Sequence, residues 1–434
     1  MKGEELYKRG RQVIPGGTQL LSKRPEMFAP DRWPSYYSKA KGVKVWDLEG
    51  TTAYTDMSIM GIGACILGYA DDDVDNAVIG AIRNGVASSL NCPEEVELAE
   101  LLIELHPWAE MVRYTRSGGE AMSVAVRIAR ASTHRDLVLF SGYHGWTDWY
   151  LAANLGETDA LDGHLMPGLQ PTGVPRGLRG SAIGFPVNDI AALRSLVSGR
   201  EKEVAAIVIE PARGEEAPVD YLKQLAAYAA EIGAVLIFDE ITSAFRMNAG
   251  GIHLRYGVNP DIAVFAKSMA NGYAMAAIIG RERVMEAAQG SFISSTNWTE
   301  RVGPTAALAT IRKYRANNVQ DHIIAIGDQV KKVWNEASRA TGVPIKVSGL
   351  PTLAAFAFDS KHNQAMQTFY VLEMLRHGFL GFRQFKPAYA HTLDDVKRYG
   401  TAVTEVFGEL ATRDPATLLS SPAAHTGFAR LTRE

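Results

Sequence analysis

The side chain whose position most clearly suggests a chemical role is a lysine that follows an apolar run. Residues 262–266 are apolar and small, and Lys267 comes directly after them in the stretch AVFAKSMANGY. A lysine at the end of a buried strand is costly unless a partner or a reaction uses its amine. A second apolar run, LIFDE, ends with Asp239 and Glu240. We expect Asp239 and Lys267 to lie on neighbouring strands, with a structural ion pair to Arg246 as the alternative role of the two carboxylates.

Two further strand ends carry polar or flexible residues. Ser117, Gly118 and Gly119 stand between a predicted strand and a helix, in TRSGGEA. Glycines there let a ligand approach the backbone, and a helix N-terminus offers free N–H groups to an anion. The same turn could simply connect the two elements, and it lacks the GxxxxGK[ST] spacing of a nucleotide-binding loop. Tyr143 and His144 follow another strand, where an aromatic ring can stack on a flat ligand or merely pack.

A metal site is a further possibility at His144. Asp148 is the neighbouring carboxylate that could share the metal, but no other clustered ligands accompany the two residues. Because metal sites in proteins generally use three or more side chains, we expect no metal.

Alternating strand-like and helix-like runs place these residues at one edge of a sheet. The expected strands are 111–116, 137–140, 205–211, 234–240, 262–267 and 276–280, and the expected helices include 119–132 and 220–233. Such alternation is typical of an α/β fold with a mainly parallel sheet and helices on both faces. Ligands bind beyond the carboxyl ends of such strands.

The pattern changes along the chain in a way that predicts three parts. Residues 1–60 form an N-terminal segment, which includes two short strands around Glu49 and Gly50. Residues 61–302 form a large ligand-binding domain, and residues 303–434 a smaller α+β C-terminal domain. The long segment 142–184 is rich in glycine and proline, which is typical of a lid or a binding loop.

Composition narrows the class of protein. The chain has 434 residues, 47% hydrophobic and 21% charged, with a net charge of -3. No basic block is present, so nucleic acid and anionic membranes are not expected partners. The two cysteines, Cys65 and Cys92, are too few for a disulfide framework. No signal sequence or apolar run of transmembrane length stands out. We therefore expect a cytoplasmic enzyme.

One cofactor needs the combination of an anion cradle, an aromatic face, a carboxylate and a lysine. Pyridoxal phosphate has a phosphate, a flat ring, a basic pyridine nitrogen and an aldehyde that forms a Schiff base with lysine. The carboxylate would keep the pyridine nitrogen protonated. The lysine would hold the cofactor and then act as a base on the substrate.

Over most of its length the chain resembles the class III aminotransferases that depend on pyridoxal phosphate. The resemblance extends from PGG at 15–17 to AHTLDDV at 390–396 and is greatest to the glutamate-1-semialdehyde aminomutase branch. The matching motifs are VIPGG, GVKVWDLEG, MVRYTRSGGEAMSVAVRIAR, YHGWTD, VIEP, LIFDEITSAFR, PDIAVFAKSMANGY and STNWTE. The resemblance implies the fold type I architecture, with a seven-stranded type of sheet and a homodimer whose active sites are shared.

The resemblance also implies roles for individual residues. Lys267 would form the Schiff base, and Asp239 would contact the pyridine nitrogen. The other expected cofactor contacts, to the ring or to the phosphate, are Ser117, Gly118, Gly119, Tyr143, His144, Glu210 and Ile241. Tyr143 and Ile241 would cover the two faces of the ring, and Thr296 would reach the phosphate of the neighbouring subunit.

The sequence departs from the aminomutase pattern at several places. Gly119 stands where the aminomutase usually has threonine, and Ala244 stands within TSAFR where glycine is usual. The aminomutase holds the substrate carboxylate with a serine and an arginine after its PGG. In PGGTQLLSKRPEM, Ser22 and Arg24 are the candidates for that role. The run STNWTERVGP also differs from the usual Gly-Asn-Pro.

These features favour an aminotransferase that moves an amino group from a donor such as glutamate to an aldehyde or a ketone. Trp146 and Trp149, with Asp148 and His164 in the expected lid, suit a polyhydroxylated ring. An oxidised amino sugar is therefore a candidate acceptor, and part of the subfamily serves aminoglycoside antibiotic biosynthesis. The tryptophans could instead pack in the core or at a dimer interface. The alternatives are an aminomutase, an epimerase, or a non-enzymatic binding protein with this fold.

Overall fold

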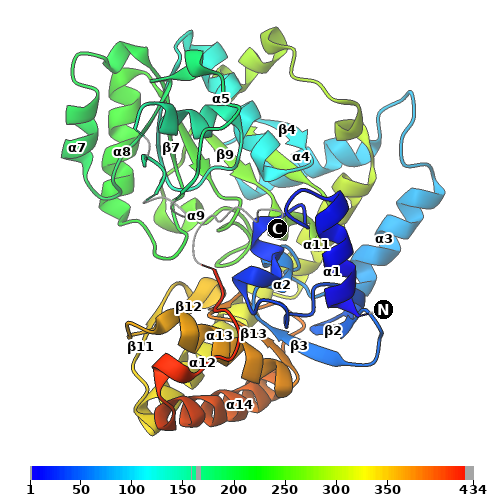
Figure 1. Cartoon of the computed structure of the whole chain (residues 1–434). Helices are drawn as coiled ribbons and strands as arrows, with labels where there is room; N and C mark the ends of the chain where they lie inside the picture. Colours follow the sequence, from blue (N-terminus) through cyan, green and yellow to red (C-terminus); the bar gives the residue numbers. More distant parts are fainter. Residues whose placement is uncertain (1, 158, 163–167, 426–434) are drawn as a thin grey trace. The chain divides into compact units, whose positions relative to one another are not determined.

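The computed structural model describes residues 2–157, 159–162 and 168–425 (Figure 1). His164 lies outside the described residues. The chain divides into two compact units, one formed by Asp72–Gln320 and the other by Met1–Asp71 together with Asp321–Glu434. The N-terminal segment thus shares a unit with the C-terminal residues. This division differs from the expected 1–60, 61–302 and 303–434, because a strand near each end of the chain enters the same sheet.

A seven-stranded sheet forms the centre of the unit Asp72–Gln320. Its strand order is β4-β10-β9-β8-β7-β5-β6. Strand β10 runs antiparallel to its two neighbours, and the other pairs are parallel, so the expected mainly parallel sheet is confirmed. The strands are β4 (Met111–Thr115), β5 (Leu137–Ser141), β6 (Ala182–Gly184), β7 (Val204–Ile209), β8 (Val235–Asp239), β9 (Ile262–Phe265) and β10 (Ala276–Gly280).

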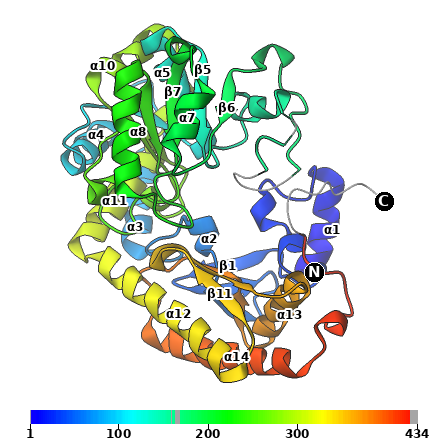
Figure 2. The same cartoon turned by 90° about the vertical axis from the view of Figure 1, so that its left-hand side faces the viewer.

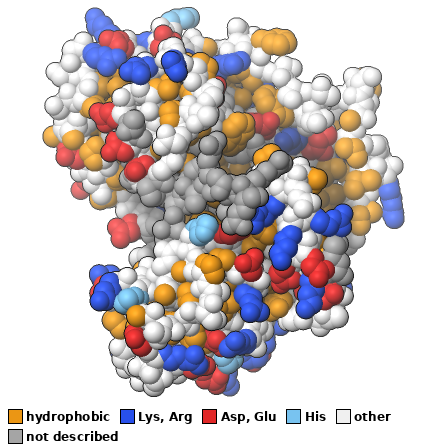
Figure 3. Space-filling view, in the orientation of Figure 1, with side chains coloured by type: hydrophobic (Ala, Val, Ile, Leu, Met, Phe, Trp, Pro, Cys, Tyr) orange, Lys and Arg blue, Asp and Glu red, His pale blue; other side chains and the backbone are white. Residues whose placement is uncertain are grey.

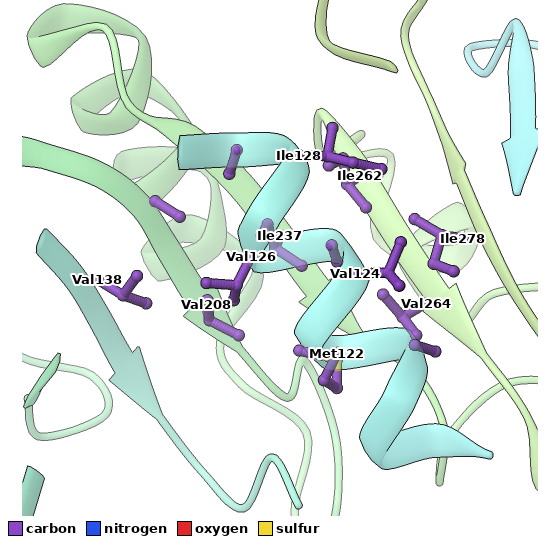
Figure 4. Close-up of a cluster of buried hydrophobic side chains, with 14 of the residues drawn as sticks. Met122, Val124, Val126, Ile128, Val138, Val208, Ile237, Ile262, Val264 and Ile278 are labelled. Atoms are coloured by element: carbon purple, nitrogen blue, oxygen red, sulfur yellow. The ribbon is translucent and has the colours of Figure 1, made fainter. Parts of the chain in front are cut away.

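Helices cover both faces of this sheet. The helices of this unit are α3 (Asp72–Arg83), α4 (Pro93–Leu105), α5 (Gly118–Thr133), α6 (Asp148–Leu151), α7 (Ile190–Leu196), α8 (Val219–Ile232), α9 (His253–Tyr256), α10 (Glu282–Met285) and α11 (Val302–Ala316), of which α3 packs on α11. Val208 and Ile237 pack against α5 on one face (Figure 4). Ile207 and Leu236, one position away in each strand, pack with α7 and α8 on the other face (Figure 2). Alternate residues point to opposite faces, so strands covered on both sides must be apolar throughout.

The second unit is α+β, with two small sheets ordered β1-β2-β3-β13 and β11-β12-β14. Its strands are β1 (Tyr37–Lys41), β2 (Lys44–Asp47), β3 (Ala53–Met57), β11 (Ile345–Ser348), β12 (Ala354–Phe358), β13 (Phe379–Gly381) and β14 (Gln384–Phe385). Its helices are α1 (Gly3–Val13), α2 (Met60–Gly63), α12 (Val319–Thr341), α13 (Asn363–Arg376) and α14 (Leu393–Thr412). Trp334, Tyr370 and Tyr399 form a hydrogen-bonded group in its apolar core.

The predicted strands and turns agree with the structure, except that some strands end at a different residue. The hairpin around Gly50 is present, because β2 pairs antiparallel with β3 and Gly50 takes the positive φ of 73° that a tight turn requires. Strand β9 ends at Phe265 rather than at Lys267, which begins a short 3₁₀ turn, Lys267–Ala270. The segment 142–184 includes the short helix α6 among its described residues.

The face of the molecule drawn in Figure 3 carries acidic and basic side chains interspersed with one another. No helix among the described residues is both long enough and apolar enough to cross a membrane.

Candidate active site

The start of α5 presents a stretch of bare backbone. Ser117 caps the helix: its hydroxyl accepts from the N–H of Glu120, and its own N–H donates to the Glu120 carboxylate at 3.0 Å. A Cβ added at Gly118 would lie 2.8 Å from Ile241 Cδ1, so a side chain there would have to displace Ile241. The two glycines therefore leave the first N–H groups of the helix open to an anion.

The loop after β5 lies against this helix start. A Cβ at Gly119 would lie 3.0 Å from the indole nitrogen of Trp146, so the glycine makes room for the tryptophan. Trp146 is 69% exposed, whereas Trp149 is buried in the core around α5, near His144. This burial favours a packing role for Trp149 over direct contact with a substrate.

A buried carboxylate and imidazole meet at the end of β8. Asp239 Oδ2 lies 2.8 Å from His144 Nδ1, and both side chains are almost inaccessible to solvent. Asp239 Oδ1 accepts from the N–H of Ile241 at 3.1 Å. The other ring nitrogen of His144 lies 3.1 Å from the carbonyl oxygen of Ser141. Both partners of the ring are oxygen atoms, so the two contacts together hold the imidazole in one orientation beside the carboxylate.

Lys267 follows the neighbouring strand, as its position in the sequence predicts. Asp239 pairs with Val264 across the parallel strands β8 and β9, which brings the two strand ends together. Lys267 has a φ of 44°, a rare conformation for a residue with a side chain. Its Nζ donates to Thr242 Oγ1 at 2.8 Å. Burial lowers the pKa of the Lys267 amine to about 8, so a substantial fraction is neutral and nucleophilic near that pH.

Glu210 and Tyr143 lie beside this group. Glu210 follows β7, and its carboxylate accepts from the N–H of Tyr143 and from Arg213 Nη1, each at 2.9 Å. The charge of Glu210 partly offsets the effect of burial on the pKa of Lys267. Arg213 was not among the residues that the sequence suggested, and its guanidinium lies 5.3 Å from the centre of the Tyr143 ring.

A second buried carboxylate, Glu240, belongs to a network that sequence reasoning missed. Glu240 contacts the ring of His253, and it accepts from the N–H groups of Ile252 and His253. Burial opposes the charge of Glu240, but these contacts outweigh it and lower the pKa of the carboxyl. Trp108 donates to the other nitrogen of His253 at 2.8 Å. The network fixes the loop after β8, which carries Ile241 and Thr242.

The remaining predicted residues are not brought into this group. Thr296 is exposed at the start of a 3₁₀ turn, Thr296–Thr299. Ser22 and Arg24 belong to the other compact unit, Ser22 within the turn Leu21–Lys23 and Arg24 beside Gly16. Asp148 begins α6, and no group of three or more His, Cys, Asp or Glu side chains in the described part of the chain could hold a metal ion.

These residues fit pyridoxal phosphate. Gly118 and Gly119 carry no side chains of their own at the helix start, which suits a phosphate bound by backbone N–H groups. A carboxylate paired with an imidazole and a desolvated amine lie at the ends of adjacent strands, which suits a pyridine nitrogen and an aldehyde.

The lowered pKa of Lys267 leads to a chemical prediction for the cofactor-free protein. We expect its modification by acetic anhydride to rise with pH, with a midpoint at pH about 8, and then to level off. Exposed lysines should continue to gain reactivity up to pH about 10, because their amines are ordinarily neutral only above about 10.4. Peptide mass spectrometry after short labelling gives the profile for each lysine. A Lys267 profile that coincides with those of exposed lysines would contradict the desolvation described above.

Comparison with known proteins places the chain in a family. The family model for class III aminotransferases matches residues 28–388. A 3-aminobutyryl-CoA aminotransferase of Cloacimonas acidaminovorans is 31% identical, over 93% of this chain and 96% of the relative. A 2'-deamino-2'-hydroxyneamine transaminase of Streptomyces kanamyceticus is 29% identical, over 86% and 92%. A glutamate-1-semialdehyde 2,1-aminomutase of Nitratidesulfovibrio vulgaris is 30% identical, over 91% and 96%.

A solved structure agrees with these relatives. An omega-transaminase from Sphaerobacter thermophilus superposes with a TM-score of 0.82 at 26% identity, over 94% of this chain and 97% of that one. The family match and the fold lead to one conclusion: the chain belongs to the class III aminotransferases and is a transaminase that depends on pyridoxal phosphate.

Proposed function

We propose that the enzyme transfers an amino group from a donor such as glutamate to an aldehyde or a ketone, with Lys267 and Asp239 as the catalytic residues. The observation that carries the proposal is the pairing of strands β8 and β9. It sets a desolvated amine beside the strand that ends in a carboxylate paired with an imidazole. A non-enzymatic protein that used this fold only for binding would not need a buried amine at Lys267 or a buried carboxylate at Asp239. The presence of both argues against the non-enzymatic alternative.

Each side chain has a defined task when the cofactor is bound. Pyridoxal phosphate supplies a ring that accepts the electron pair left when a bond to the substrate's amino-bearing carbon breaks. Gly118 and Gly119 would bind the phosphate through backbone N–H groups, with Ser117 beside them. Tyr143 and Ile241 would cover the two faces of the ring, and Asp239 would hold a proton on the pyridine nitrogen.

His144 and Thr242 position the two catalytic groups. His144 contacts Asp239 and so holds the carboxylate in one orientation. Thr242 accepts a hydrogen bond from Lys267 and so directs the amine. In the donor half-reaction the neutral Lys267 Nζ would take the proton from the amino-bearing carbon of the donor. In the acceptor half-reaction the same amine would deliver a proton to the acceptor carbon.

An oxidised amino sugar is the acceptor class that we favour. The neamine transaminase among the relatives is named for an aminoglycoside substrate. The exposed Trp146, next to the helix start that binds the phosphate, offers a flat surface to a sugar ring. The aminomutases among the relatives support the alternative of an internal amino transfer on glutamate semialdehyde.

We further propose that the enzyme works as a homodimer in the cytoplasm. Exposed apolar residues gather on α3 and the loop after it, which is typical of an interface: Ile79, Ile82, Val86 and Leu90. Thr296, exposed here, would reach the phosphate bound by the neighbouring subunit. Cys65 and Cys92 are free thiols, as is usual in a reducing compartment.

The first prediction concerns the attachment of the cofactor. Lys267→Ala should abolish covalent labelling by pyridoxal phosphate after borohydride reduction, because Lys267 is the amine that we assign to the Schiff base. Intact-mass spectrometry measures the label. Lys223→Ala, an exposed lysine on α8, is the control and should label as the wild type does. A Lys267→Ala protein that still carries one specific label would show that another lysine holds the cofactor.

The second prediction concerns the acceptor. After a donor has converted the cofactor to its amine form, an amino-sugar aldehyde or ketone should restore the original spectrum faster than glutamate semialdehyde does. Stopped-flow absorbance at matched acceptor concentrations gives both rates. Trp146→Ala should slow the sugar reaction more than the semialdehyde reaction. Faster reoxidation by glutamate semialdehyde would favour the aminomutase.

The third prediction concerns the shared site. Thr296→Ala should weaken cofactor binding by about 10-fold or more, because a hydrogen bond to a charged phosphate contributes roughly 1.5–3 kcal/mol. A heterodimer of Lys267→Ala and Thr296→Ala subunits concentrates both defects in one site and leaves the other intact. It should regain about half of the wild-type activity per dimer if each site uses Lys267 of one subunit and Thr296 of the other. Absence of recovery in purified heterodimers rules out this arrangement.

A further inference from the structure

We propose that Arg213 recognises the carboxylate of the amino donor, and that Glu210 occupies its guanidinium until that carboxylate arrives. This proposal rests on the function proposed above and deepens it, since it names an anionic donor class and the residue that selects it.

The loop after β7 holds Arg213 at a fixed place. An isolated bridge pairs Ala212 with Glu216, and the N–H of Ala217 donates to the carbonyl oxygen of Pro211 at 3.0 Å. The N–H of Arg213 itself donates to the carbonyl oxygen of Glu215 at 3.2 Å. These backbone contacts close a short loop, so Arg213 starts from a defined position although its side chain reaches toward solvent.

The contacts of the guanidinium leave most of its donors available. It donates one hydrogen bond within the described part of the chain, from Nη1 to Glu210 Oε2 at 2.9 Å. A guanidinium has five N–H donors, and two of them suit a carboxylate in parallel. The Tyr143 ring, 5.3 Å from the Arg213 Cζ, gives it a flat support. Arg213 is therefore oriented but not saturated.

The two members of the pair differ in how firmly they are held. The side chain of Glu210 is 6% exposed and that of Arg213 is 36% exposed. Glu210 Oε2 also accepts from the N–H of Tyr143 at 2.9 Å. Gly142 keeps a φ of 112° beside it, where a Cβ would lie 2.7 Å from Glu210 Oε2. A bound carboxylate can thus take over the guanidinium while Glu210 keeps its backbone donor.

Arg213 borders a cavity of about 630 Å³ at the carboxyl ends of β5, β6 and β7. Among the described residues that line the cavity, Arg213 is the one cation, and Glu210, Glu215 and Glu216 are the carboxylates. An anion is therefore repelled everywhere along this wall except at the guanidinium, which gives it one place and one orientation.

The charges of Glu210 and Arg213 also act on the amine of Lys267. After burial, the largest influences on the pKa of Lys267 are Glu210, which raises it, and Arg213, which lowers it. Both groups thus lie within electrostatic range of the amine that takes the donor's proton. Arg213 also lies beside Tyr143, the residue assigned to one face of the cofactor ring, so a donor held by its carboxylate at Arg213 is oriented from the ring side of the site.

The test compares L-glutamate with its two amides, L-isoglutamine and L-glutamine, in the donor half-reaction followed by cofactor absorbance. Arg213→Gln should raise the KM for glutamate about 10- to 100-fold, the range expected for a lost charge-assisted hydrogen bond. One of the two amides lacks the carboxylate that Arg213 binds. For that amide, Arg213→Gln should change the KM little. Arg213→Lys should lie between the two, because it keeps the charge without the forked donors.

Arg200→Gln is the matched control. Arg200 also pairs with a glutamate three residues away, Glu203, but it lies before β7 on an exposed turn. Its substitution should leave all three KM values unchanged. An equal effect of Arg200→Gln and Arg213→Gln on the KM for glutamate overturns the proposal. The proposal also fails if Arg213→Gln, with normal cofactor absorbance, keeps the wild-type ratio of the KM values for glutamate and the two amides.

A binding experiment separates this proposal from the proposed function. Glutarate has both carboxylates of glutamate and no amine, so it cannot react. Calorimetric titration of glutarate into the holoenzyme should give binding that Arg213→Gln abolishes and Arg200→Gln retains. If no amine donor changes the wild-type spectrum, the proposed amino transfer from such a donor fails. Loss of glutarate binding in Arg213→Gln would then still support an anion site at Arg213. Equal glutarate binding by wild type and Arg213→Gln overturns the site itself.

Discussion

A charged carboxylate buried at the end of β8 is the constraint on which the site depends. An isolated buried charge is very unfavourable, so Asp239 must have a cationic or hydrogen-bonding environment. His144 provides the ring contact, and Ile241 provides a backbone N–H. The first partner comes from the loop after β5 and the second from the turn after β8. Satisfying one carboxylate therefore fixes both segments, and with them the side chains of Tyr143 and Thr242.

Much of this framework could be predicted from the sequence, because a doubly covered sheet requires wholly apolar strands. Runs such as those of β7 and β8 are long enough to recognise, and the polar residue that ends each run marks the carboxyl edge of the sheet. The adjacency of Asp239 and Lys267 follows from that topology. The conformation of Lys267 does not: its positive φ depends on the turn that follows β9, and no residue pattern specifies that turn.

The contacts that join distant residues could not be predicted in this way. Trp108 reaches His253 across 145 positions, and the loop after β7 sets Arg213 over Tyr143. Spacing along the chain carries no information on either contact, since both depend on how loops from separate strands close. The prediction that Trp149 contacts the substrate came from the local sequence alone, and the packing of the ring does not favour it. A tryptophan in a glycine-rich loop suggests a ligand contact, but its helix, α6, turns the ring into the core.

The parallel pairing of β3 with β13 has a consequence for synthesis of the chain. Thr55 has its partner at Phe379, so the four-stranded sheet joins residues from opposite ends of the polypeptide. At about 5–20 residues per second, the ribosome needs roughly 15–65 s to deliver the partner strand. Before that interval ends, the unit Asp72–Gln320 is complete and free to fold, while β3 still waits with one edge unpaired. The nascent chain therefore carries an open strand edge, the kind of surface that chaperones shield, until almost the whole protein has emerged.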